Sequence, residues 1–242
     1  MSSGSSALFR HRRLAGAVLL VVLGVLGPDP PARGEGGRQA ASGDCVTVGR
    51  PKLGVKYAFH FTDPAGTVST STTEYLAVSD TSLRLRLTHS GATGTVERVN
   101  DSTVRVEDDQ VVVEKMVSSG TNERGAFQNT VTFQGARIGD PASRVCGGRT
   151  WSIPSVAVST MGSQGGSSEM TTDAGSGRVI SVRESVTVPA GTFRTVHYQK
   201  ISDGAHGHVV EETWLSISDG VAVKYTHEEP AGVATQVLTG TH

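Results

Sequence analysis

Apolar and polar residues alternate with a period of two along most of this chain, and this pattern restricts its fold more than any other feature. In residues 55–61 the odd-numbered positions are Val, Tyr, Phe and Phe, whereas the even-numbered positions are Lys, Ala and His. Residues 83–88 alternate leucine with arginine and threonine. A period of two is that of a β-strand with one buried and one solvated face. After Leu26 no segment repeats apolar residues at helical spacing for three turns, so the sequence predicts an all-β fold.

Further strands are predicted wherever valine and threonine dominate a short run between turn residues, because both side chains fit a pleated, half-buried surface. These runs are 67–78, 94–100, 103–107, 110–118, 126–133, 150–159, 178–188, 193–201, 208–217, 221–228 and 233–239.

A repeated turn sequence supports an antiparallel arrangement. Pro-Ala-Gly occurs at residues 64–66, 189–191 and 230–232, each time between alternating segments. Proline favours the first central position of a type I turn and glycine the left-handed position that follows, so each triplet predicts a three-residue hairpin loop with a glycine bulge. Consecutive hairpins make the strands over 178–239 sequential neighbours. We expect an antiparallel meander that forms a curved sheet, a half-barrel or a sandwich.

The pair Asp219-Gly220 predicts one hairpin in more detail. Asp-Gly is favoured in two-residue type I′ loops, and such a loop would place Trp214 opposite Tyr225. In the same register, Glu212 would face His227.

The amino terminus has the three parts of a secretory signal peptide. Basic residues at 10–13 precede an uncharged apolar run over 14–26, which is short for a membrane span, and small residues at 32 and 34 offer a cleavage site before Glu35. The alternative is an uncleaved anchor. With cleavage, the chain divides into a signal peptide (1–34), a flexible leader (35–50) and a β domain (51–242), and the mature chain has no transmembrane segment.

The expected location is therefore secreted or periplasmic, in the cell envelope. The glycine- and serine-rich stretch over 161–177 predicts a loop, and an alternative division of the β domain has two halves joined by this loop.

Two cysteines, Cys45 and Cys146, follow the cleavage site of the signal peptide, and an even count in an exported protein predicts one disulfide bond. Two free thiols are the alternative.

Composition argues against several functions. The formal net charge is -1 and no basic block follows residue 13, so the basic face that nucleic acids require is missing. No G-x-S-x-G motif is present, and the glycine-rich stretch lacks a phosphate-binding lysine. We therefore expect no cofactor and, on balance, no enzymatic activity. An exported hydrolase assembled from distant Ser, His and Asp residues is the remaining enzymatic alternative.

One group of residues is a candidate metal site. His206 and His208 lie close in sequence, and the expected hairpin would bring Glu212 and His227 near them. Imidazole and carboxylate ligands could together hold zinc or copper. The alternative is that these histidines are ordinary polar loop residues.

The carboxy-terminal third resembles a known group of proteins. Residues 184–198 read E-S-V-T-V-P-A-G-T-F-R-T-V-H-Y, and residues 211–225 read E-E-T-W-L-S-I-S-D-G-V-A-V-K-Y. This pattern is similar to exported bacterial β-rich proteins of unknown function that carry a V-P-A-G-x-F hairpin, some of which resemble the half-open barrels of periplasmic lipoprotein carriers.

The resemblance implies a curved sheet with an apolar groove, and Phe193, Trp214 and Tyr225 match its aromatic positions. It implies that these residues line a site for a lipid or another apolar ligand, or for a protein of the envelope. Ordinary core packing is the alternative role for the three rings. The alternative function is a structural or protein-interaction module that pairs through a sheet edge or face.

Overall fold

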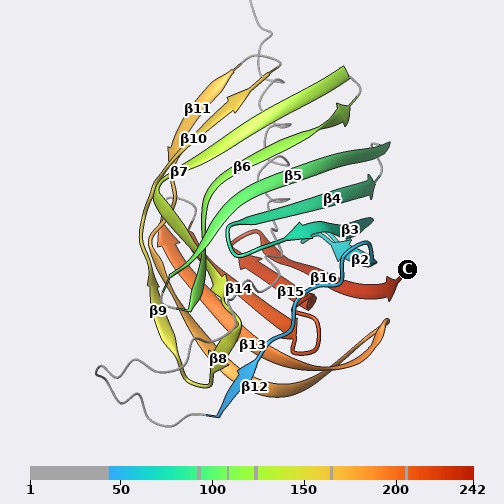
Figure 1. The fold of residues 1–242 in the computed structure, drawn as a ribbon, viewed down its shortest axis with the longest axis vertical. Helices are drawn as coiled ribbons and strands as arrows, with labels where there is room; N and C mark the ends of the chain where they lie inside the picture. Colours follow the sequence, from blue (N-terminus) through green and yellow to red (C-terminus); the bar gives the residue numbers. More distant parts are fainter. Residues whose placement is uncertain (1–43, 92–93, 108, 123–124, 164–165, 205–206) are drawn as a thin grey trace, which may run out of the picture.

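The computed structural model describes residues 44–91, 94–107, 109–122, 125–163, 166–204 and 207–242, and within them the chain is all-β (Figure 1). Fourteen strands form one antiparallel sheet and two strands form a small second sheet. No helix in these ranges is long and apolar enough to cross a membrane. The expected signal peptide lies outside the described residues.

The bounds of the strands are β1 (Cys45–Thr47), β2 (Lys56–Thr62), β3 (Val68–Val78), β4 (Ser82–Gly91), β5 (Gly94–Glu107), β6 (Gln110–Asn122), β7 (Gly125–Pro141), β8 (Arg144–Cys146), β9 (Thr150–Ile153), β10 (Ala157–Gly162), β11 (Ser167–Thr171), β12 (Gly175–Val188), β13 (Gly191–Gly204), β14 (Gly207–Ser216), β15 (Ala222–Glu229) and β16 (Gly232–Thr241). Several strands, β7 and β13 among them, are longer than the runs predicted from the sequence, whereas β14 and β15 match the predicted lengths. Two runs predicted over 94–107 are one strand, and the run predicted over 150–159 is two.

The large sheet has the order β11-β10-β7-β6-β5-β4-β3-β2-β16-β15-β14-β13-β12-β9. The meander predicted for the carboxy-terminal third is confirmed, since β12 to β16 are sequential neighbours. A second meander runs from β2 to β7, and the pairing of β2 with β16 joins the two. The sheet curls strongly (Figure 1). Residues 154–156 link β9 to β10, so the two ends of the sheet lie close together without closing into a barrel.

The glycine- and serine-rich stretch is not the loop that we expected. It contains β11 and the start of β12, and the Thr172 N–H donates to the Val156 carbonyl at 2.9 Å. Two of its glycines serve close packing within the sheet: a Cβ on Gly175 would meet the Ile201 carbonyl, and a Cβ on Gly177 would meet the Trp151 ring. These glycines therefore allow neighbouring groups to approach the backbone.

The three Pro-Ala-Gly sequences form hairpin turns, as predicted, but not all in the same way. At 64–66 the loop has three residues, with Gly66 at a φ of 83° and the pair Asp63–Thr67 closing it. In the other two turns the glycine is already paired across the hairpin, Val188 with Gly191 and Glu229 with Gly232. Those two loops therefore contain proline and alanine alone.

The register predicted around Asp219-Gly220 is wrong by one residue. Trp214 lies opposite Lys224, and Tyr225 lies opposite Thr213. The hairpin closes at Ser216, whose N–H donates to the Val221 carbonyl at 2.8 Å, so residues 217–220 form a longer loop.

Contacts from distant parts of the chain explain this loop. The Ile217 N–H donates to the Arg194 carbonyl of β13 at 2.9 Å, and the Ile217 carbonyl accepts from the Gly49 N–H at 2.8 Å. Because both backbone groups of Ile217 bind outside the hairpin, they cannot pair across a two-residue turn.

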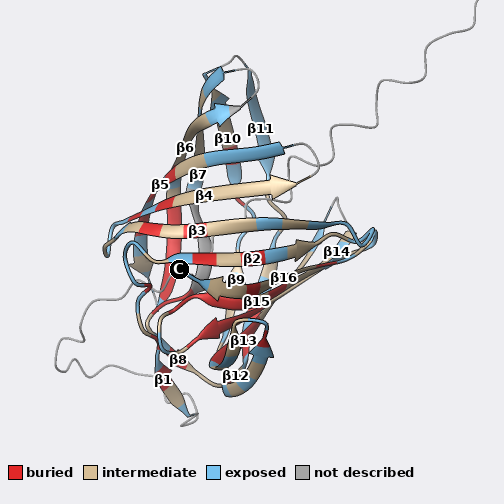
Figure 2. Cartoon of the chain, turned by 90° about the vertical axis from the view of Figure 1, so that its right-hand side faces the viewer, coloured by how far each residue is buried: buried red, intermediate tan, exposed pale blue. Residues whose placement is uncertain are grey.

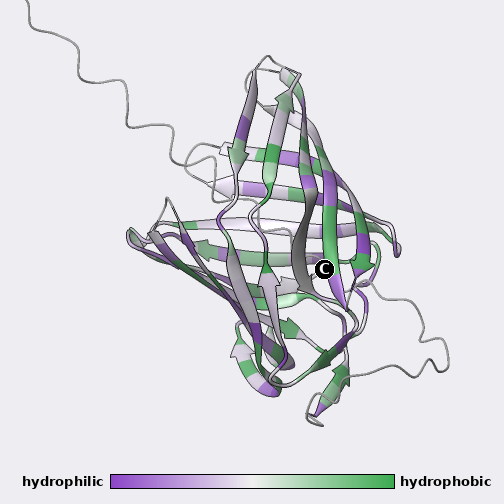
Figure 3. Cartoon of the chain, turned by 90° about the vertical axis from the view of Figure 1, so that its left-hand side faces the viewer, coloured by the Kyte–Doolittle hydropathy of each residue, from purple (hydrophilic) through white to green (hydrophobic). Residues whose placement is uncertain are grey.

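Buried side chains concentrate on one face of the large sheet, which we call the core face. Tyr75, Leu85, Phe133 and Val158 belong to it and to one continuous apolar cluster. Alternating hydrophobic and hydrophilic positions are visible along the strands (Figure 3). Burial decreases towards β10 and β11 at one extremity of the sheet (Figure 2).

The small sheet covers a second apolar cluster. Val46 of β1 and Val145 of β8 pack there with Tyr198 and Leu215 of the meander. The disulfide bond predicted between Cys45 and Cys146 is present and joins β1 to β8 at a directly paired position.

Candidate functional site

The three aromatic residues matched by the resemblance do not share one wall. Trp214 is 6% exposed and Tyr225 is 7% exposed, while Phe193 is partly buried against the main cluster. Trp214 pairs with His197 of β13 and therefore lies on the same face as Phe193. Tyr225 pairs with Thr213 and lies on the opposite face.

Trp214 is held by polar as well as apolar contacts. Its ring stacks on the His197 ring, with centroids 4.2 Å apart and an interplanar angle of 18°. The Lys224 Nζ lies 4.3 Å from the centroid of the indole, within cation–π range. The indole Nε1–H donates to Glu184 Oε1 at 3.2 Å. The Trp214 ring on β14 thus contacts side chains of three other strands of the meander, β12, β13 and β15.

His197 is the centre of this polar network, and sequence reasoning did not identify it. Its Nδ1 lies 3.0 Å from Glu184 Oε2, and its Nε2 lies 3.5 Å from Glu212 Oε1. Gln199 donates to the same Glu212 oxygen at 3.1 Å. Every group named here ties neighbouring strands of the meander together. The available sequence signal was a histidine inside a strongly alternating segment.

A second polar network lies on the opposite face. Lys200 Nζ is 3.2 Å from Glu211 Oε2, and the Tyr225 hydroxyl donates to Glu211 Oε1 at 2.7 Å. His227 lies beside the same carboxylate, with Nδ1 at 3.6 Å from Oε1. The hydrogen bond with Glu211 raises the pKa of His227, although partial burial opposes this shift.

The candidate metal ligands do not come together in the described residues. His206 lies outside them, and His208 is exposed with its Nδ1 2.7 Å from Asp203 Oδ1. Because the register differs from the expected one, Glu212 lies opposite Thr226 and points away from the face that carries His227. The described part of the chain has no group of three or more side chains arranged to hold a metal ion.

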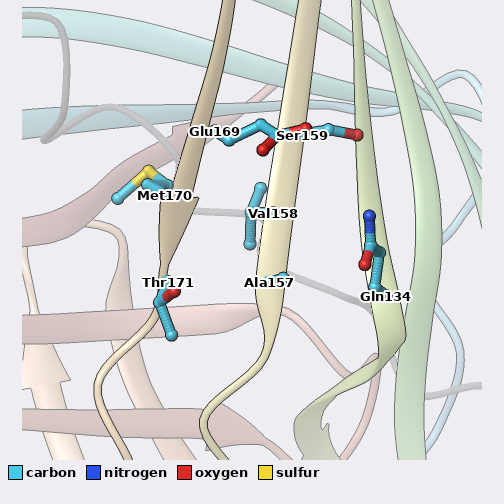
Figure 4. A pocket seen from close by; sticks show the side chains of 7 residues that line it. All are labelled: Gln134, Ala157, Val158, Ser159, Glu169, Met170 and Thr171. Carbon is cyan, nitrogen blue, oxygen red and sulfur yellow. The ribbon is translucent and has the colours of Figure 1, made fainter.

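A hollow of ≈ 210 Å³ lies at the extremity of the sheet, over β7, β10 and β11 (Figure 4). Small side chains on β10, Ala157 and Ser159, form its middle, with Gln134 of β7 on one side and Glu169 and Thr171 of β11 on the other. Val158 and Met170 also border it.

The hollow adjoins a row of apolar residues on the core face. Phe133, Val158 and Met170 are directly paired across β7, β10 and β11. They are 7%, 5% and 55% exposed, so this row runs from the buried core to the solvent. Searches among protein-family models, curated proteins and solved structures found no match to this chain.

Proposed function

We propose that this chain is an exported, non-enzymatic binding protein that takes up a lipid or another apolar ligand of the cell envelope. The observation that carries the proposal is the row Phe133–Val158–Met170, which continues the apolar core face to an exposed position on the terminal strand. A contiguous apolar path from core to surface is a feature of ligand grooves and interaction sites. The strong curl of the sheet and the resemblance of the carboxy-terminal third agree with such a groove.

Native mass spectrometry of the protein purified from its own host tests this function. We expect a mass adduct in the range of a lipid, released by organic solvent. Replacing Met170 with aspartate places a charge at the end of the apolar row, so the adduct should be lost while the melting temperature stays within about 2 °C of the wild type.

Met161 provides the matched control. It is 69% exposed on β10, on the face opposite to Val158, so Met161→Asp adds the same charge without reaching the apolar row. The adduct should persist in this variant. Protein without any adduct, or an adduct that survives Met170→Asp, would count against the proposed function.

Export is part of the same proposal. A disulfide bond between Cys45 and Cys146 agrees with an oxidising compartment. Amino-terminal sequencing of protein recovered from the envelope or the medium should begin at or near Glu35. Recovery of the intact amino terminus from the membrane fraction would instead identify residues 14–26 as an anchor.

A further inference from the structure

The terminal strand β11 presents backbone hydrogen-bonding groups along its outer edge. It pairs with β10 on one side and is the last strand of the sheet, and all five of its residues are exposed. The Thr172 N–H donates to the Val156 carbonyl, and the Gly162 N–H donates to the Gly166 carbonyl. In an antiparallel ladder, hydrogen-bonded pairs alternate with pairs that are not hydrogen-bonded. The even-numbered residues of β11 therefore bond to β10. The odd-numbered residues Ser167, Glu169 and Thr171 direct their N–H and C=O groups outwards.

The same strand carries a charge beside the hollow. Glu169 and Thr171 lie on one face of β11, next to the small side chains Ala157 and Ser159 of β10. Within the described residues no ion pair involves Glu169. A strand added to the edge would place one residue directly opposite Glu169 and on the same face. A lysine or arginine at that position can reach the Glu169 carboxylate, which lies between the added strand and the hollow.

We propose that the outer edge of β11 binds an extended segment of another protein that places a lysine or arginine opposite Glu169. Main-chain hydrogen bonds to Ser167, Glu169 and Thr171 extend the sheet, and the Glu169 carboxylate beside the hollow selects the basic side chain. A second copy of this chain fits poorly, because antiparallel self-pairing of β11 about its centre places two Glu169 carboxylates opposite each other. Glu169 lies on the face of β11 opposite to Met170, the exposed end of the apolar row.

Two synthetic peptides test the proposal: acetyl-TVTKTVT-amide and its counterpart acetyl-TVTETVT-amide. Each is titrated into the folded protein, and binding is measured by isothermal titration calorimetry. We expect the lysine peptide to bind about tenfold more tightly than the glutamate peptide, since the exchange replaces an attractive cross-strand pair by a repulsive one. The variant Glu169→Lys should reverse this preference. Glu228→Lys, at an exposed position of β15, makes the same change of net charge and should leave the preference intact.

A backbone variant separates strand addition from simple charge attraction. Thr171→Pro removes an outward N–H and leaves the ladder with β10 intact, so it should abolish binding of both peptides without changing the melting temperature. Equal affinities for the two peptides, undiminished binding to Thr171→Pro, or no binding of either peptide at about 1 mM would each overturn the proposal. A concentration-dependent dimer that Glu169→Lys abolishes would also overturn it, in favour of a second copy at this edge.

Discussion

Replacing Trp214 with alanine should destabilise the fold by about 4 kcal/mol. Its side chain is 6% exposed, and burial of ~150–250 Å² at ~25 cal/mol per Å² gives roughly 4–6 kcal/mol as an upper estimate. Measured Trp-to-Ala changes in protein cores cost about 3–5 kcal/mol. The two approaches agree because the indole is enclosed by His197, Lys224 and the apolar cluster.

Smaller changes divide this loss into its parts. Trp214→Phe keeps an aromatic ring beside His197 but removes the Nε1–H that donates to Glu184. Loss of this hydrogen bond should cost about 1 kcal/mol, because the Glu184 side chain is 38% exposed. Lys224→Met removes the cation above the ring and should cost ~0.5–1 kcal/mol. A double-mutant cycle between Trp214→Phe and Glu184→Gln measures the first contribution directly.

Urea unfolding followed by far-UV circular dichroism gives the required free energies. Met161→Ala is the control, because this exposed side chain should change the stability by less than ~0.5 kcal/mol. A cost below about 1 kcal/mol for Trp214→Ala, with an unchanged m-value, would instead show that the ring contributes little to packing.

Three further predictions follow from particular contacts. Gly177→Ala should cost ~1–3 kcal/mol because its Cβ would meet the Trp151 ring, and the additional change Trp151→Ala should recover part of that loss in the same urea assay. Replacing Cys45 and Cys146 together by serine should lower the stability by ~4–5 kcal/mol on the chain-entropy model for a loop of this length; a loss below ~1 kcal/mol would contradict it. Because the pKa of His227 is raised above its usual 6.5 in the folded state, its stabilising effect is full below pH 6.5 and disappears as the pH rises through the raised pKa. The difference in stability between wild type and His227→Gln should therefore be largest near about pH 5 and shrink above neutrality, and a difference that grows with pH would show the opposite linkage.

Local patterns were sufficient to predict the fold class and the carboxy-terminal meander. Period-two alternation depends only on which side chains face the core, so segments such as 55–61 and 83–88 indicate strands without knowledge of their partners. The Pro-Ala-Gly turns and the cysteine pair are similarly short-range or compositional signals, and the structure contains the turns and the disulfide bond.

Signals that depend on distant contacts were misread. The glycines at 175 and 177 indicated a loop by composition, whereas close approach of Ile201 and Trp151 requires small residues in a strand. The local sequence alone does not distinguish either glycine from one in a flexible linker. The pairing of β7 with β10, which leaves β11 as one terminal strand, likewise has no local signature. The same holds for the pairing of β12 with β9, which leaves β9 as the other terminal strand.

The candidate sites show the same division. The alternating pattern along the chain is enough to show which residues can face the core, and hence that Trp214 and Tyr225 belong to paired strands. That the two rings lie on opposite faces depends on long-range contacts, because Ile217 binds Arg194 and Gly49 and the hairpin is thereby shifted by one residue. In a β-sheet a shift of one residue exchanges the two faces, so backbone contacts made far from the Asp219-Gly220 turn determine which side chains meet.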